Sequence, residues 1–151
     1  MTARLKQGRD DVPKRKTATP WFAGGIQFEC QTCGMCCRGE PGYVWVTADE
    51  ITRMAKHVGL PRDEFFAAFV RRVGPSLSLR ERPDGDCVLW RDGCTVYVCR
   101  PSQCRTFPFW EDALASRRSF RQAVRGCPGV GHGKLYSYED ILRIAAGEQD
   151  T

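Results

Sequence analysis

Four cysteines lie within eight positions of the sequence FECQTCGMCC, at Cys30, Cys33, Cys36 and Cys37. A C-x2-C turn lets two thiolates converge on one metal, as zinc knuckles and iron–sulfur loops do. A third cysteine two residues later favours an iron–sulfur cluster, and Gly34 permits the close backbone approach that such a loop needs. Because four reduced thiols crowd one loop, the segment predicts metal binding or thiol oxidation rather than a purely structural role.

The adjacent pair Cys36 and Cys37 can ligate one centre only with awkward geometry, so one of them is expected to serve a second centre or the fold. Cys127 precedes Pro128, the order that ends bacterial ferredoxin runs. Eight thiolates would fill two four-thiolate sites and leave one cysteine over. The sequence does not divide the thiols between sites, and one site with several buried free cysteines stays open. The further candidate ligands are Cys87, Cys94, Cys99, Cys104 and Cys127.

Nine cysteines in 151 residues admit disulfides, metal ligands or redox thiols. The first twenty residues contain no apolar core of the kind that a signal peptide has, and no later stretch is long and apolar enough to span a membrane. We therefore expect a cytoplasmic protein without membrane association, in which the thiols stay reduced and bind metal or catalyse.

The net charge of +5 is concentrated at the N-terminus, where residues 1–20 contain six basic and two acidic side chains. Such a proline-containing segment without aromatic residues before Trp21 is typical of a solvated disordered arm. No basic face extends it into the rest of the chain, so nucleic-acid binding is not expected. The sequence predicts a basic arm over residues 1–20 and a cysteine-rich metal-binding domain over residues 21–151.

Hydrophobic spacing predicts a small single α+β domain with a short antiparallel sheet, three to four helices and cysteine-rich loops. Helices are expected over residues 47–59, 61–74, 116–125 and 137–147, with capping boxes at the first and last. Strands are expected over 42–46 and 76–81, and a hairpin over 87–99. Residues 100–110 are expected to be irregular.

The order of four segments resembles the YkgJ-type cysteine-cluster family, a zinc- or iron-chelating domain named for its CxxCxxCC motif. The segments are FECQTCGMCC, GYVWVTADEITRMAKHVGL, CVLWRDGCTVYVCRPSQCRTFPFW and GCPGVGHGKLYSYEDI, and the resemblance spans about residues 28–144. A related region in the flagellin lysine methylase is associated with an iron–sulfur cluster. The resemblance implies a ligand pool of eight cysteines, with Cys127 as a further candidate, and does not imply methylase activity. The eight are Cys30, Cys33, Cys36, Cys37, Cys87, Cys94, Cys99 and Cys104.

Three functions remain open. The first is an iron–sulfur protein, with [4Fe-4S] favoured, that carries electrons or assists a modifying enzyme through a protein partner; Arg100 and Arg105 would then lie beside the ligands and adjust the cluster's potential. The second is a zinc-stapled interaction domain. The third is a metal-dependent enzyme with an open coordination position, in which Arg100 or Arg105 binds an anionic substrate.

Overall fold

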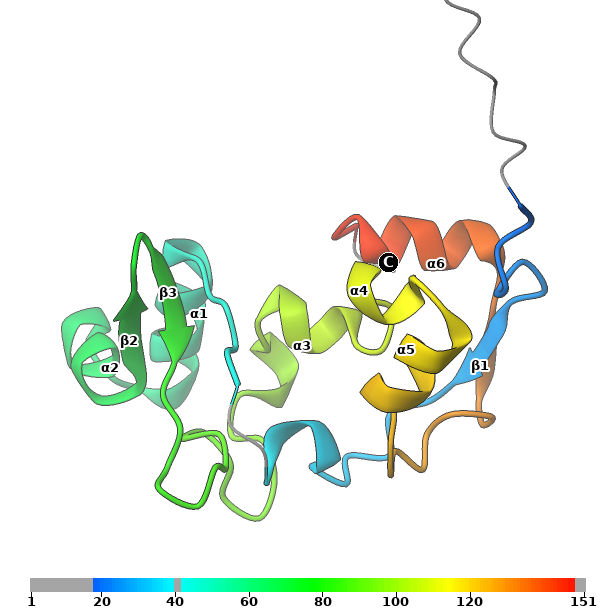
Figure 1. The fold of residues 1–151 in the computed structure, drawn as a ribbon. Helices are drawn as coiled ribbons and strands as arrows, with labels where there is room; N and C mark the ends of the chain where they lie inside the picture. Colours follow the sequence, from blue (N-terminus) through cyan, green and yellow to red (C-terminus); the bar gives the residue numbers. More distant parts are fainter. Residues whose placement is uncertain (1–17, 40–41, 149–151) are drawn as a thin grey trace, which may run out of the picture.

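The computed structural model describes residues 18–39 and 42–148. Most of the expected basic arm therefore lies outside the described residues. Within them the elements form two groups, each with its own hydrophobic core, and the helix α3 (Ser102–Thr106) lies between the groups (Figure 1). No helix among the described residues has the length and apolar character needed to cross a bilayer.

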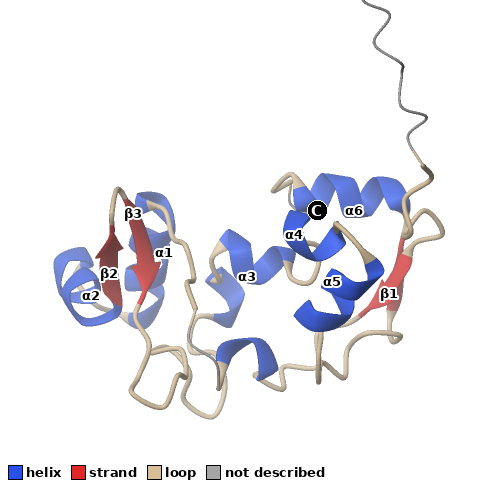
Figure 2. Cartoon of the chain, in the orientation of Figure 1, coloured by secondary structure: helices blue, strands red, loops and turns tan. Residues whose placement is uncertain are grey.

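The first group contains α1 (Ala48–Val58), α2 (Arg62–Phe69) and the antiparallel pair β2 (Val70–Val73) and β3 (Ser76–Leu79) (Figure 2). The hydroxyl of Thr47 accepts from the N–H of Glu50, and the Glu50 carboxylate accepts from the N–H of Thr47, so α1 begins with the predicted capping box. The core of this group is formed by Val46, Ile51, Met54, Ala55, Phe65, Val70, Leu79, Leu89 and Val96.

The second group joins the two ends of the described chain. The strand β1 (Ile26–Phe28) pairs antiparallel with β4 (Lys134–Tyr136), beside α4 (Glu111–Leu114), α5 (Arg117–Ala123) and α6 (Tyr138–Ala145). Ser137 and Asp140 form the second predicted capping box, at the start of α6. The core of this group is formed by Phe22, Ile26, Phe28, Phe109, Ala113, Leu114, Phe120 and Ile141.

Short irregular segments connect the groups and carry most of the cysteines. Two single-turn 3-10 helices, η1 (Met35–Cys37) and η2 (Tyr97–Cys99), end at cysteine residues, and α3 contains Cys104. These three short helices contain no fully buried residue, so their positions depend on the two groups and on the contacts that join them.

The predicted α+β class with short antiparallel pairing is confirmed, and α1, α2, α5 and α6 form where capping and apolar spacing predict helices. The predicted helix over 61–74 was too long, since it ends at Phe69 and residues 70–73 form β2. The predicted 87–99 hairpin reduces to one bridge between Trp90 and Cys94, followed by η2. The strand predicted over 42–46 is not a regular strand, since these residues run beside β3 with a single bridge at Trp45. In the segment predicted to be irregular, residues 100–110, the short helix α3 forms, and the short helix α4 follows directly after it.

Candidate metal centre

Backbone contacts hold the start of the first cysteine loop, and a close contact with Trp90 holds its middle. At its start, the N–H of Glu29 donates to the carbonyl of Gly129 at 3.0 Å, which joins the loop to the C-terminal segment. In its middle, Gly34 adopts φ +78°, and a Cβ at this position would lie 2.3 Å from the indole ring of Trp90. Only glycine meets both conditions without strain. The close approach that Gly34 permits is therefore to Trp90.

The end of the loop is bonded to the segment around the next cysteine. The N–H of Cys87 donates to the carbonyl of Cys37 at 2.7 Å. Beside it, the buried carboxylate of Asp86 accepts from the N–H of Gly39 at 3.1 Å and lies 3.5 Å from the guanidinium of Arg38. These contacts bring Cys87 next to the Cys36–Cys37 pair.

A cavity of about 310 Å³ lies between the two groups, and eight of the nine cysteines line it. Its walls come from both halves: Leu79 and Val96 belong to the first core, whereas Phe28 belongs to the second. The lining cysteines are Cys30, Cys33, Cys36, Cys37, Cys87, Cys94, Cys104 and Cys127. Cys99 does not line it and instead packs against the first core.

The donors suit zinc or iron, because thiolates are preferred ligands of both. The sulfurs of Cys36 and Cys37 lie 3.9 Å apart. In a tetrahedral zinc site with Zn–S of about 2.3 Å, neighbouring sulfurs are about 3.8 Å apart. However, no three cysteine, histidine or acidic side chains in residues 18–39 and 42–148 are close enough together to hold one ion as they stand. The thiols surround a space and have to move inward to bind a single ion.

The adjacent thiols Cys36 and Cys37 have opposite pKa shifts. The hydrogen bond between the sulfurs of Cys36 and Cys37 lowers the pKa of Cys36 to about 6, and the Arg100 guanidinium contributes to the same shift. The same hydrogen bond, with burial, raises the pKa of Cys37. Because the thiolate is the metal-binding form, Cys36 is prepared to ligate near neutral pH.

Burial has the opposite effect on the deeper cysteines. It raises the pKa of Cys104 to about 12, and the neighbouring thiols Cys87, Cys36 and Cys94 add to the shift. Burial also raises the pKa values of Cys87, Cys94 and Cys99. These groups remain neutral thiols in metal-free protein at neutral pH, and a bound cation is needed to convert them to thiolates.

The two candidate arginines occupy different positions. Arg100 lines the cysteine cavity, and its guanidinium carbon lies 3.8 Å from the centre of the Tyr97 ring. Arg105 does not line that cavity but lines a neighbouring one, which Arg100 also borders. Only Arg100 therefore directly faces the space that the cysteines surround.

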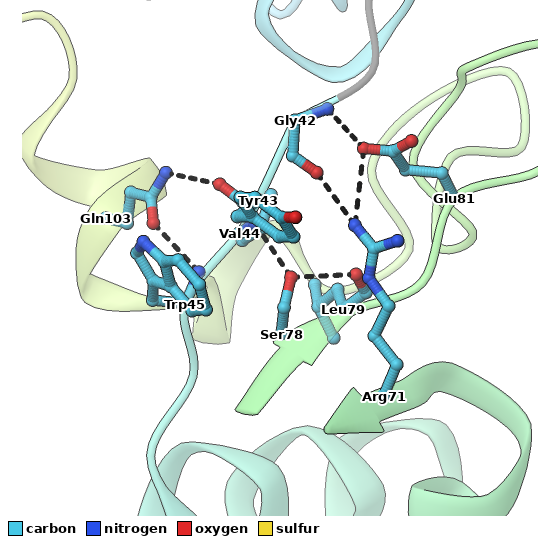
Figure 3. A network of polar contacts seen from close by, with 9 residues as sticks. All are labelled: Gly42, Tyr43, Val44, Trp45, Arg71, Ser78, Leu79, Glu81 and Gln103. Carbon is cyan, nitrogen blue, oxygen red and sulfur yellow. Dashed lines mark hydrogen bonds and ion pairs between the residues drawn. The ribbon is translucent and has the colours of Figure 1, made fainter. Parts of the chain in front are cut away.

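A polar network attaches the segment after the cysteine loop to both sides of the molecule (Figure 3). The side chain of Gln103 on α3 accepts from the N–H of Trp45 at 2.8 Å and donates to the carbonyl of Tyr43 at 2.9 Å. The hydroxyl of Ser78 on β3 accepts from the N–H of Val44 at 3.1 Å. The segment is thus held between the helix that carries Cys104 and the sheet of the first group.

Glu50 makes a second connection to α3. Its carboxylate is buried, and besides capping α1 it accepts from the N–H of Ser102 at 2.7 Å. The sequence predicted the cap but not this contact between distant helices. Asp86 and Trp90 were not predicted as site residues either; their only sequence signal is their position next to Cys87 and within the CVLW segment.

Comparison with known proteins agrees with this arrangement. Residues 29–128 match the CxxCxxCC family, described as a "Putative zinc- or iron-chelating domain". A protein of Methanocaldococcus jannaschii that is named as uncharacterised is 26% identical over 133 residues, which cover 80% of this chain and 71% of the relative. No solved structure matches the chain. The family match takes in all nine cysteines, and the chain belongs to the CxxCxxCC family of metal-chelating domains.

Proposed function

We propose that the cysteine cavity holds an iron–sulfur cluster, most simply [4Fe-4S], and that the protein works as an electron carrier or as an accessory module of a modifying enzyme in the cytoplasm. The observation that carries this proposal is the cavity of about 310 Å³ lined by eight thiols, no three of which in the described residues converge on a single ion. A cluster is wider than one ion, so ligands spread around such a space can reach it from several sides.

The exposure of the first loop supports the electron-transfer role. Cys30, Cys33 and Cys36 are exposed, whereas the other six cysteines are partly buried. A cluster bound to the first loop would therefore lie near the surface, where a redox or enzyme partner can approach it. The partly buried ligands and Arg100 would adjust its potential, since solvent exposure and nearby charge both affect cluster potentials.

Analysis of cysteine variants tests the proposal. We expect wild-type protein purified without oxygen to contain iron and acid-labile sulfide in similar amounts. Cys33→Ser should lose most of both, whereas Cys99→Ser, the matched change at the cysteine outside the cavity, should keep them. Equal retention by the two variants, or iron without sulfide in wild-type protein, would contradict a cluster in this cavity.

A structural zinc site is the second candidate, and the distribution of the thiols favours it too. Cys87 and Cys94 pack against the first core and Cys127 against the second, so a metal between them would join the two halves. Structural zinc contributes directly to folding free energy. Zinc without sulfide, together with unfolding by a chelator, is the result expected of this candidate and not of the first.

A further inference from the structure

A second cavity adjoins the cysteine cavity and shares part of its wall. Its volume is about 370 Å³, which lies within the range of small-molecule sites. Six residues line both cavities, three of them cysteines, so a molecule bound in the second cavity would lie against the cysteine side chains. The shared residues are Phe28, Cys30, Cys36, Arg100, Cys104 and Phe107.

Two arginines that form no ion pair within the described residues, Arg100 and Arg105, line this cavity. The Nε atoms of Arg100 and Arg105 are buried and have no hydrogen-bond partner in the described part of the chain. Arg71 and Arg82 also have such an Nε atom, but each forms an ion pair with a neighbouring carboxylate. Neither Arg100 nor Arg105 forms an ion pair with any residue in 18–39 or 42–148. Because both arginines line the cavity, an anion bound there can match the charge of their guanidinium groups.

The backbone of both arginines is held by local structure, and the guanidinium of Arg100 is held as well. Arg100 has the extended conformation that the following Pro101 favours, and its guanidinium stacks on Tyr97. Arg105 lies at the end of α3, where its N–H donates to the carbonyl of Pro101 at 3.1 Å. The stacked guanidinium of Arg100 therefore loses little freedom when it binds a planar or tetrahedral oxyanion.

The remaining polar wall limits the kind of anion. The hydroxyl-bearing residues Ser102 and Thr106 and the cationic Lys134 also line the cavity, and so do the carboxylates Glu29 and Glu148. These carboxylates would repel a polyanion. The wall therefore suits a small molecule whose negative charge is confined to one group at the arginine side.

We propose that this cavity binds a small molecule through one carboxylate or phosphate group, which Arg105 and Arg100 hold by charge-assisted hydrogen bonds. Anion binding here does not depend on which metal the cysteines hold. The position of the ligand beside a metal centre, which would make it a substrate or an effector of that centre, does rest on the function proposed above.

Calorimetric titration of the full chain with inorganic phosphate and, separately, with the monocarboxylate acetate tests the proposal. We expect saturable binding of at least one probe, and the probe that binds identifies the anionic group. Arg105→Ala should weaken that binding by about tenfold or more, the effect of losing a hydrogen bond to a charged group. Arg121→Ala, a matched change at an exposed position on α5, should leave the affinity unchanged.

Three further measurements distinguish a failure of this inference from a failure of the proposed function. Metal and sulfide content, measured on the same samples, should not change in Arg105→Ala, because Arg105 does not line the cysteine cavity. If circular dichroism shows that this variant does not fold, Arg105→Lys takes its place: it keeps the charge but loses the two-pronged contact, and it should also bind more weakly. If the samples contain no metal and still bind the anion, the proposed function fails and this inference stands.

The proposal is overturned if wild-type protein binds neither probe. It is equally overturned if the Arg105 variant that folds binds as tightly as Arg121→Ala does.

Discussion

The backbone N–H of Cys87 donates to the carbonyl of Cys37 across 2.7 Å, so two cysteines that are fifty positions apart in the sequence lie in bonded segments. The contact brings the CxxCxxCC loop and the second cysteine segment to one cavity. The residue before Cys87, Asp86, accepts from the N–H of Gly39 and forms ion pairs with Arg38 and Arg82. These contacts hold the end of the loop in place. The geometry of the site therefore depends on residues that are not ligands.

The first prediction concerns this anchor. Asp86→Asn removes the charge that two arginines face, and we expect it to destabilise the protein by about 1–3 kcal/mol, the range for hydrogen bonds to charged groups. The metal content of purified protein should fall as well. Asp112→Asn, at an exposed position of α4, serves as control in thermal unfolding and metal analysis. An Asp86 variant with the stability and metal content of the control would show that the anchor is unimportant.

A second prediction separates backbone strain from packing at Gly34. Gly34 and Gly59 have nearly the same positive φ, 78° and 76°, but a Cβ would strike Trp90 at Gly34 and meet nothing within 4 Å at Gly59. In both alanine variants the free energy of unfolding should fall by about 1 kcal/mol, because alanine is strained in the left-handed backbone conformation. Only Gly34→Ala should also lose bound metal, because the loop has to move away from Trp90.

Metal content and denaturant unfolding of both variants check this expectation. Equal metal content in the two would contradict the role assigned to the Gly34–Trp90 contact.

The third prediction follows from the pKa of Cys36. Its lowered value of about 6 means that the thiolate is present above that pH, whereas a free cysteine becomes reactive near pH 8.5. In metal-free, reduced protein, iodoacetamide should modify Cys36 before Cys37, at a rate that rises through about pH 6 and levels off above it. Peptide mass spectrometry after timed labelling measures the profile. A midpoint near pH 8.5 for Cys36 would contradict the thiol pair described above.

A fourth prediction tests the connection between α1 and α3. Glu50 caps one helix and accepts from Ser102 of the other, whereas Asp140 forms a similar capping box on α6 at a partly exposed position. Glu50→Gln should destabilise the protein by about 1–3 kcal/mol, because a buried charged acceptor with two donors is lost. Asp140→Asn should cost less, because solvent weakens the hydrogen bonds that this carboxylate makes. Equal losses in thermal unfolding would mean that the Glu50–Ser102 contact adds nothing.

The sequence predicted the parts of the fold that depend on local patterns. Both capping boxes and the apolar stripe of α1 are local signals, and they formed as expected, whereas Leu142 of the stripe expected on α6 is exposed. At Val70 the helical period continued in the sequence, but pairing with Leu79 turned residues 70–73 into a strand. Tertiary pairing overrode the local pattern there.

The candidate site was partly predictable for the same reason. The cysteines that the sequence offers as candidate ligands number nine, and eight of these nine line one cavity. Spacing does not show that Cys99 faces the first core or that Arg105 faces the neighbouring cavity, because both positions depend on how η2 and α3 pack. Asp86 and Glu50 act through partners far away in the sequence, which one sequence alone does not reveal.

X-ray absorption at the iron and zinc edges, on protein purified without oxygen, tests the central claim most directly. The account predicts iron with sulfur neighbours and a second shell of iron scattering, together with about one acid-labile sulfide per iron, as a cubane cluster requires. Zinc surrounded only by sulfur, or iron without an iron neighbour, would contradict a cluster in the cysteine cavity.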